Sequence, residues 1–313
     1  MTASRITAVG HYQPAEIMTN ADLEKLVETN DEWIRSRVGI EERRIARTET
    51  VADMAIQAAA KALAASGRTA EEIDLVVVAT TTAIDRCPST AARVAAALGL
   101  TAPGAMDVNT ACSGFSYALA VADHAVRSGA SRAALVVASE KMSDVTDWTD
   151  RTTCVLIGDG AGAAVIEACE DEAAGVGPVF WGSVPEKSRT VLIEGDVPRF
   201  SQEGQAVYRW VTGEVADLAR RACEAAGVTP EELAGFVPHQ ANLRMIEPLA
   251  RQLGMQDKVV ARDVVTSGNT SAASVGIALS KLVESGELRS GDQVLLFGFG
   301  GGIAYAGQVV RCP

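Results

Sequence analysis

A chain of 313 residues with 48% hydrophobic side chains is long enough for two sizeable cores, or for one core shared by two halves. Its formal charge of −12 argues against non-specific nucleic-acid binding, which depends on Lys and Arg neutralising phosphates. The longest apolar stretches fall short of the roughly 20 residues that cross a bilayer, and the first residues lack the apolar core of a signal peptide. We therefore expect a cytoplasmic protein that is not embedded in a membrane.

In chain order, the predicted elements alternate between buried strands and Ala-rich helices. After an opening strand, a charged segment at 19–50 interrupts the first half before its first helix. Helices are expected at 51–66, 89–98 and 116–127, and strands at 74–79 and 133–138. After an irregular region at 170–204, the second half has helices at 215–226, 243–253 and 274–284 and strands at 233–238 and 293–297. This alternation predicts α/β layers with mainly parallel sheets, divided into halves at 1–169 and 170–313.

The two halves also resemble each other in sequence. Residues 61–73 (KALAASGRTAEEI) align with residues 221–233 (RACEAAGVTPEEL), and the strands that follow end at Ala79 and His239. A second alignment places Cys112 opposite Asn269 and the Ser-Gly pair at 128–129 opposite the pair at 285–286. A repeat of this length indicates a duplicated domain, so that residues at equivalent element ends can converge between the halves.

Cys112 lies where a strand turns into the helix that begins near residue 113. A thiol at a helix N-terminus lies near the positive end of the helix dipole, which would lower its pKa and favour the nucleophilic thiolate. The alternative is a small, inert packing residue, as buried cysteines often are. The six cysteines contain no CxxC pair or metal-ligand spacing, which favours reduced thiols and no metal site.

His239, one of three histidines, follows a predicted buried strand, and ligands bind at such strand ends in layered α/β folds. The alternative is a loop cap. Asn269 precedes another helix and could serve as its N-cap, but its place opposite Cys112 favours a functional role.

Two glycine-rich runs differ in their expected use. The run at 297–302 (FGFGGG) would let the backbone approach a ligand and direct N–H groups at a developing oxyanion. The run at 158–162 (GDGAG) is interpreted as a tight turn between packed strands.

Six ordered motifs now suggest a family: DEWIR (31–35), TACSGF (110–115), GDGAGAA (158–164), PHQANLR (238–244), GNTSAAS (268–274) and FGGG (299–302). With them the chain resembles the β-ketoacyl-acyl carrier protein synthase III family of thiolase-fold condensing enzymes over nearly its whole length. The resemblance implies a five-layered αβαβα thiolase fold of two duplicated halves, a homodimer, and initiation of type II fatty acid biosynthesis. An acyl-CoA primer would condense with malonyl-acyl carrier protein, both as substrates, and no metal or redox cofactor is implied.

The resemblance also implies residue roles. Cys112, His239 and Asn269 would form the catalytic triad, and backbone N–H groups of Cys112 and Gly301 would form the oxyanion hole. The implied ligand-contacting residues are Trp33, Arg37, Arg151 and Asn242 for coenzyme A, Arg244 and Arg209 for the carrier protein, and Cys87 and Phe299 for the acyl pocket.

Several alternatives remain open. A pathway-specific relative could initiate polyketide synthesis or transfer the acyl group to a hydroxyl or amine. A thiolase is less favoured because the C-terminal glycine loop lacks a second cysteine, and a non-catalytic partner subunit because Cys112, His239 and Asn269 are all present. Cys87 before Pro88, with a short 170–204 region, suggests that branched or medium-length primers are accepted besides acetyl.

Overall fold

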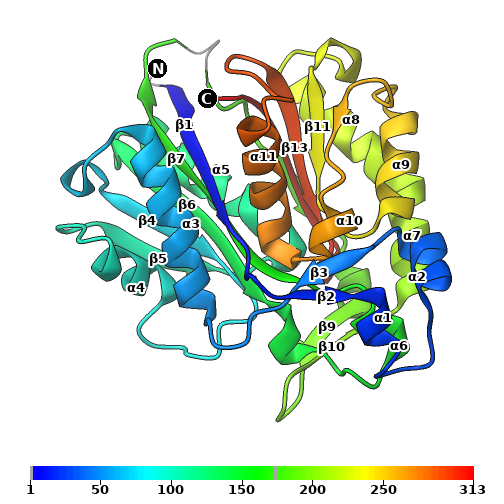
Figure 1. Ribbon diagram of the computed structural model, residues 1–313. Coiled ribbons are helices and arrows are strands. Elements are labelled where there is room, and N and C mark those ends of the chain that lie inside the picture. Colours follow the sequence, from blue (N-terminus) through cyan, green and yellow to red (C-terminus); the bar gives the residue numbers. More distant parts are fainter. Residues whose placement is uncertain (1–2, 172–174) are drawn as a thin grey trace.

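The computed structural model describes residues 3–171 and 175–313, and two five-stranded mixed sheets dominate it (Figure 1). The first sheet has the strand order β1 (Ala3–Tyr12), β7 (Asp159–Cys169), β6 (Ala133–Lys141), β4 (Leu75–Ala79), β5 (Gly104–Val108). The second has the order β12 (Val259–Val260), β11 (Gly235–Pro238), β13 (Gln293–Phe299), β14 (Ala304–Arg311), β8 (Phe180–Ser183). Each sheet has a parallel strand pair at its centre and antiparallel neighbours toward one edge.

Helices cover both sheets and fill the space between them (Figure 1). The outer helices of the first sheet are α3 (Val51–Ser66) and α4 (Thr90–Ala97), the central helices are α5 (Gly114–Arg127) and α11 (Ser274–Glu284), and the outer helices of the second sheet are α8 (Ala216–Ala225) and α9 (Leu243–Gln252). Because helices pack on both faces, a central strand such as β4 is apolar and buried at every position. The result is a five-layered helix–sheet–helix–sheet–helix arrangement.

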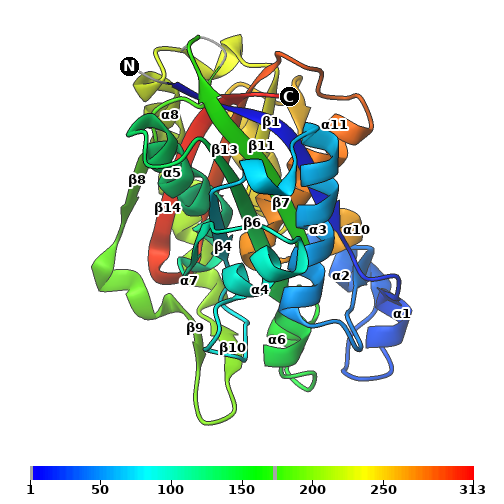
Figure 2. The same ribbon diagram turned by 90° about the vertical axis from the view of Figure 1, so that its left-hand side faces the viewer.

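Two segments outside these layers have structure of their own. The segment expected at 19–50 begins two residues earlier in the structure, with β2 (Ile17–Thr19), and continues through α1 (Asn20–Leu23), α2 (Asp31–Val38) and β3 (Glu42–Arg44), with β2 and β3 paired. In the region expected to be irregular, β9 (Val191–Glu194) and β10 (Arg199–Gln202) form a two-stranded ribbon that projects from the body (Figure 2).

The remaining helices are short or continuous with a neighbour. They are α6 (Arg151–Cys154), α10 (Val264–Ser267) and α7 (Gly204–Trp210), which continues through a π-helical turn at Val211–Val215 into α8. Among the described residues, no helix combines the length and apolarity that crossing a bilayer requires.

The same turn precedes the central helix of each half. Residues 111–113 and 271–273 both form a 3₁₀ turn, and its first residue, Ala111 or Ser271, has a φ of 47°. The turn is held in the same way in both halves, because the Ala111 N–H donates to Asn109 Oδ1 at 3.3 Å and the Ser271 N–H donates to Asn269 Oδ1 at 2.9 Å.

This match corrects the second alignment of the repeat. Cys112 is equivalent to Ala272 in the other half, and Asn269 is equivalent to Asn109. The error arises because α5 has 14 residues and α11 has only 11, so that matching the Ser-Gly pairs after the helices shifts the register at their starts. The alignment of Ala79 with His239 remains consistent with the structure, since β4 and β11 occupy equivalent positions, each next to the parallel edge strand of its sheet.

The GDGAG run is also placed differently from the expected turn. Asp159 begins β7, and Gly162 lies within that strand beneath α11. A Cβ added at Gly162 would lie 2.4 Å from the backbone carbon of Gly276, so these two glycines allow β7 and α11 to pack backbone against backbone. The glycines therefore serve close packing between the halves.

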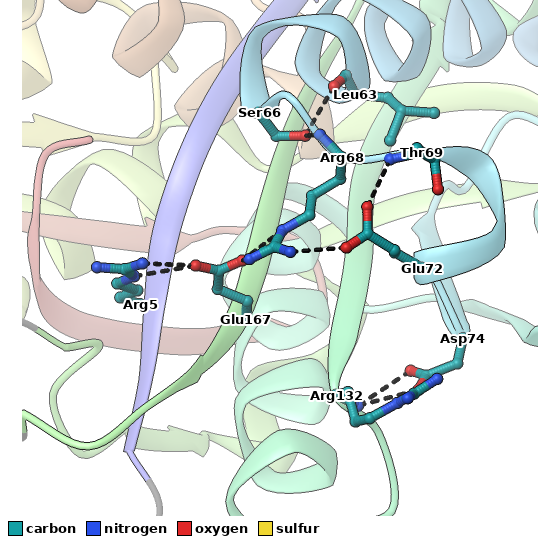
Figure 3. A network of polar contacts seen from close by, with 9 residues as sticks. All are labelled: Arg5, Leu63, Ser66, Arg68, Thr69, Glu72, Asp74, Arg132 and Glu167. Carbon is teal, nitrogen blue, oxygen red and sulfur yellow. Dashed lines mark hydrogen bonds and ion pairs between the residues drawn. The ribbon is translucent and has the colours of Figure 1, made fainter.

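A polar network attaches the turn after α3 to strands β1 and β7 of the first sheet (Figure 3). The Glu167 side chain on β7 is 7% exposed and accepts from Arg5 Nη2 at 2.7 Å and from Arg68 Nε at 2.8 Å. Arg68 also donates to Glu72 at 2.7 Å, and Glu72 accepts from the Thr69 N–H at 2.8 Å. One largely buried carboxylate thus joins β1, β7 and the turn after α3.

Candidate active site

A cavity of about 170 Å³ is lined by residues of both halves. Cys112 reaches it from the turn before α5, His239 from the residue after β11, and Asn269 from the loop before the equivalent turn of the second half. The three residues selected from the sequence therefore line one cavity. It contains both a thiol and polar groups that can donate hydrogen bonds.

The Cys112 thiol is partly buried, and its surroundings influence its pKa in opposite directions. Burial raises the pKa and is the largest effect, and the charge of Glu140 also raises it, while hydrogen bonds from the Gly301 N–H, the Ser271 hydroxyl and the Cys112 N–H lower it. The net shift is upward, so the expectation of a lowered pKa is wrong: in this structure, loss of hydration outweighs the donors at the helix start.

The C-terminal glycine loop touches Cys112 directly. Gly300 has a φ of 152°, and a Cβ added there would lie 2.6 Å from the Cβ and 2.9 Å from the Sγ of Cys112. A Cβ at Gly301 would lie 2.6 Å from the Cβ of Ala111. The glycines allow the loop to approach closely, with the Gly301 N–H directed at Sγ.

His239 is held in one orientation and kept neutral. It is 2% exposed, its ring packs edge-on to Phe299 at 5.4 Å, and burial lowers its pKa to about 3. Nδ1 lies 2.8 Å from Ser274 Oγ. The Ser274 oxygen accepts from the Gln240 N–H at 3.3 Å, and its hydroxyl can at the same time donate to Nδ1. In that arrangement the ring proton lies on Nε2.

Asn269 has most of its polar groups occupied by the scaffold. Its N–H donates to the Leu156 carbonyl at 2.7 Å, and its own carbonyl accepts from Gly158 at 3.1 Å. With Oδ1 bonded to the Ser271 N–H, Nδ2 is the side-chain atom left to donate. Asn269 therefore supports the turn before α11, as a capping residue would, and also lines the cavity.

The residues expected at a coenzyme A site lie on α2, α6 and the start of α9. The Arg151 guanidinium carbon is 5.0 Å from the Trp33 ring centroid, and Arg151 also donates to the Glu28 carbonyl at 2.9 Å. Arg37 is exposed on α2. Asn242 lines the cavity, and its Oδ1 accepts from the Met245 N–H at 3.1 Å as the N-cap of α9.

The two arginines expected at a carrier-protein surface are both exposed. The Arg244 guanidinium carbon is 5.9 Å from the ring of Tyr208, a residue that lines the cavity. Arg209 lies in a neighbouring surface hollow with Lys187 and Arg189. Glu186, Glu203 and Glu214 line the same hollow, and Lys187 is paired with Glu214 at 3.1 Å. The formal charges of the hollow therefore balance, and positive charge is contributed only at the individual positions of Arg244 and Arg209.

The structure separates the two residues expected in an acyl pocket. Phe299 is buried and lines the cavity, next to Val191 and Phe200 from the β9–β10 ribbon. Cys87 is exposed on the loop before α4 and is not among the residues that line the cavity in this chain.

Three polar residues behind the cavity were not found by motif spacing: Glu140, Ser271 and Ser274. Glu140 is fully buried near the end of β6, two residues after the apolar run at 133–138. A carboxylate so close to a doubly covered strand is an unusual placement that could have drawn attention. The two serines lie inside the GNTSAAS run, but only the fold shows what they contact.

Comparisons with known proteins agree with this geometry. The family model described as 3-oxoacyl-[acyl-carrier-protein (ACP)] synthase III matches residues 106–185, and the model for the C-terminal part of the same family matches residues 223–312. A β-ketoacyl-[acyl-carrier-protein] synthase III of Streptomyces avermitilis is 64% identical and covers 100% of both chains. Another, from Streptomyces coelicolor, is 65% identical and covers 99% of both.

Solved structures give the same fold. The priming β-ketosynthase of the R1128 polyketide biosynthetic pathway superposes with a TM-score of 0.97 at 41% identity, covering 99% of this chain and 96% of that one. The 3-oxoacyl-[acyl-carrier-protein] synthase III of Aquifex aeolicus superposes with a TM-score of 0.95 at 39% identity, covering 99% of this chain and 100% of that one. The chain has the thiolase fold.

Proposed function

The chain belongs to the 3-oxoacyl-[acyl-carrier-protein] synthase III family, and we propose that its cavity condenses an acyl-CoA primer with malonyl-acyl carrier protein. The products are 3-oxoacyl-acyl carrier protein, coenzyme A and carbon dioxide, and the reaction initiates type II fatty acid biosynthesis. The observation that carries the proposal is a thiol, a neutral imidazole and a carboxamide, drawn from both halves, in one cavity.

In the first half-reaction, Cys112 Sγ attacks the thioester carbonyl of acyl-CoA. The carbonyl oxygen gains negative charge and is stabilised by the N–H groups of Cys112 and Gly301, which already face Sγ. Collapse of the tetrahedral intermediate breaks the bond to the coenzyme A sulfur and leaves the acyl group on Cys112.

In the second half-reaction, the thioester oxygen of malonyl-acyl carrier protein accepts hydrogen bonds from His239 Nε2 and Asn269 Nδ2. The bond to the carboxylate breaks, carbon dioxide leaves, and its electron pair forms an enolate whose charge these donors stabilise. The enolate carbon then attacks the acyl group on Cys112. Because decarboxylation supplies the carbanion, the proposed reaction requires neither a metal nor a redox cofactor.

For substrate binding, we propose that Trp33 and Arg151 stack with the adenine of coenzyme A, supported by their 5.0 Å contact. Arg37 would lie near the phosphates and Asn242 along the pantetheine chain. Arg244 and Arg209 would contact the acidic carrier protein, which a chain of net charge −12 can attract only through a local basic surface.

The enzyme is proposed to act as a homodimer in the cytoplasm. The edge strand β5 exposes most of its residues, and its Met106 is 42% exposed. Ile84, in the loop between β4 and α4, is 77% exposed. An exposed edge strand of this kind is normally covered, and a second copy could cover it. Light scattering coupled to gel filtration tests this, and a monomer at micromolar concentration would contradict it.

For the primer, we propose that branched and medium-length acyl groups are accepted besides acetyl. Cys87 is a small exposed residue that a dimer could bring to the partner's cavity, and apolar Val191 and Phe200 line the cavity wall. Acylation rates with acetyl-, isobutyryl- and hexanoyl-CoA test this proposal. A strict preference for acetyl would overturn it.

Intact-protein mass spectrometry tests the function as a whole. Incubation with acyl-CoA should add one acyl group to the wild type and none to Cys112→Ala, and malonyl-acyl carrier protein should then release a 3-oxoacyl product. No adduct with any primer would exclude the enzyme activity.

A second function is favoured by the similarity to a priming polyketide ketosynthase. An acyl-enzyme that is productive only with a polyketide carrier protein would indicate polyketide initiation. One that yields product only with a hydroxyl or amine acceptor would indicate acyl transfer.

A further inference from the structure

The proposed mechanism leaves one proton without an acceptor. Cys112 must lose its thiol proton to attack a thioester, yet burial raises the pKa of this thiol. His239 is a poor acceptor because burial lowers its pKa to about 3 and because its Nδ1 is bonded to Ser274. Another group near Sγ that can take the proton would therefore assist acylation.

A continuous polar path leads from the thiol to a carboxylate. Cys112 Sγ lies 3.7 Å from Ser271 Oγ, and Ser271 Oγ lies 3.2 Å from Glu140 Oε1. The serine can both accept from the thiol and donate to the carboxylate, since a hydroxyl has one proton and two lone pairs.

Glu140 is an unusual buried carboxylate because its partners are neutral. Oε2 accepts from the Thr82 N–H at 3.1 Å, from the Thr82 hydroxyl, and from the Thr80 hydroxyl at 3.2 Å. Oε1 accepts from the Thr81 N–H and Ser271. Burial raises its pKa despite these donors, so protonation of Glu140 relieves a desolvated charge.

We propose that Glu140 is the proton acceptor for Cys112 and that Ser271 relays the proton between them, an inference that rests on the proposed function. As Sγ bonds to the thioester carbon, its proton passes to Ser271 Oγ and the Ser271 hydroxyl proton passes to Glu140 Oε1. Coenzyme A leaves as a thiolate and takes a proton from solvent. When condensation releases Cys112 as a thiolate, Glu140 returns its proton through Ser271.

This relay conserves charge within a buried cluster. One negative charge is present before and after proton transfer, first on Glu140 and then on the carbonyl oxygen of the tetrahedral intermediate, so no additional charge has to be desolvated. In the acyl-enzyme Glu140 is neutral, and it therefore does not repel the malonyl carboxylate or the enolate that forms beside Cys112.

Two variants break the relay at different points. Glu140→Gln keeps the size of the side chain but cannot take a proton, and Ser271→Ala removes the bridge. Alanine suits the left-handed backbone there, because the equivalent residue of the first half is Ala111 with the same φ of 47°. Rapid-quench mass spectrometry should show acylation slowed by about 100-fold or more in both, the usual contribution of general base catalysis.

The half-reactions separate a relay from a structural role. Decarboxylation of malonyl-acyl carrier protein needs no thiol proton transfer, so it should stay within about threefold of wild type in both variants. Thr80→Val is the matched control, since it removes a 3.2 Å hydrogen bond to Glu140 outside the relay and should leave acylation near wild type. Melting temperatures show whether each variant is folded.

A pH series adds a second readout. In Glu140→Gln, hydroxide must remove the proton, so acylation should rise with pH until the thiol ionises. The groups around Glu140 decide what such a pH profile reports. Across Ser271 the titratable neighbour of Glu140 is Cys112, and the neighbours from the loop after β4 are threonines, which do not titrate. Lys141, next to Glu140 in the chain, is paired with Asp144 at 3.3 Å.

Wild-type acylation rates in both folded variants would overturn the relay and leave the proposed function intact. Equal losses in acylation and decarboxylation, or an equal loss in Thr80→Val, would also overturn it. A wild-type enzyme that forms no acyl adduct would instead refute the proposed function.

Discussion

Ser274→Ala should impair the second half-reaction selectively. The Ser274 hydroxyl is the hydrogen-bond partner of His239 Nδ1 at 2.8 Å, and the His239 residue is only 2% exposed. Without it, the imidazole can move its proton to Nδ1 and present a lone pair to the thioester oxygen. Leaving a buried acceptor unsatisfied costs about 1–3 kcal/mol, which corresponds to a decarboxylation rate lower by about 5- to 150-fold.

The assay measures carbon dioxide release from malonyl-acyl carrier protein and, separately, single-turnover acylation of Cys112. Acylation should remain within about twofold of wild type, because Ser274 has no place in the path from Cys112 to Glu140. Ser280→Ala is a close control: it removes a 2.9 Å contact between a serine of α11 and His11 Nδ1, outside the cavity. Unchanged decarboxylation in Ser274→Ala, or an equal loss in Ser280→Ala, would refute the assignment of the His239 tautomer.

Three further predictions concern the glycine loop, the histidine and the nucleotide contact. Gly300→Ala should abolish acylation because its Cβ would lie 2.9 Å from Cys112 Sγ. Gly302→Ala has open space around it and should spare acylation, while its φ of 69° should cost about 1–2 kcal/mol of folding free energy; acylation rates and urea unfolding compare the two variants. Because burial lowers the pKa of His239 to about 3 from 6.5, the unfolded chain binds a proton between these values that the folded chain does not. As the pH falls below 6.5, the free energy of unfolding of the wild type should therefore decrease more steeply than that of His239→Gln, by up to about 1.4 kcal/mol for each pH unit. Identical pH slopes in urea unfolding would contradict this. Trp33→Ala should raise the KM for acyl-CoA about fivefold, the scale of a cation–π contact, but leave rates with acyl-pantetheine unchanged; an equal effect on both substrates would argue against adenine stacking.

The helices and strands of the core were predictable because their periodicity is strong. The expected helices at 51–66 and 274–284 coincide with α3 and α11, and the strand expected at 74–79 is β4 with one residue fewer. Cys112, His239 and Asn269 were selected from their positions at element ends, and they do line one cavity. Local sequence signals are therefore sufficient to predict site residues that lie at the ends of helices and strands.

The errors involve quantities that depend on the whole fold. The register between Cys112 and Asn269 was wrong because helix lengths differ between the halves. The direction of the Cys112 pKa shift depends on burial, to which distant segments contribute. Glu140 could not be connected to the thiol from the sequence because Ser271, which links them, lies in the other half.

The contact between Gly162 and Gly276 has a consequence for how this scaffold could diversify. Because β7 and α11 meet backbone to backbone, the halves cannot separate slightly to admit a larger acyl group without losing that contact. Room for a different primer has to come from parts of the wall outside this contact, such as the β9–β10 ribbon that carries Val191 and Phe200. Primer preference then becomes a transferable property: exchanging residues 191–202 between relatives should move chain-length selectivity while leaving the condensation machinery in place.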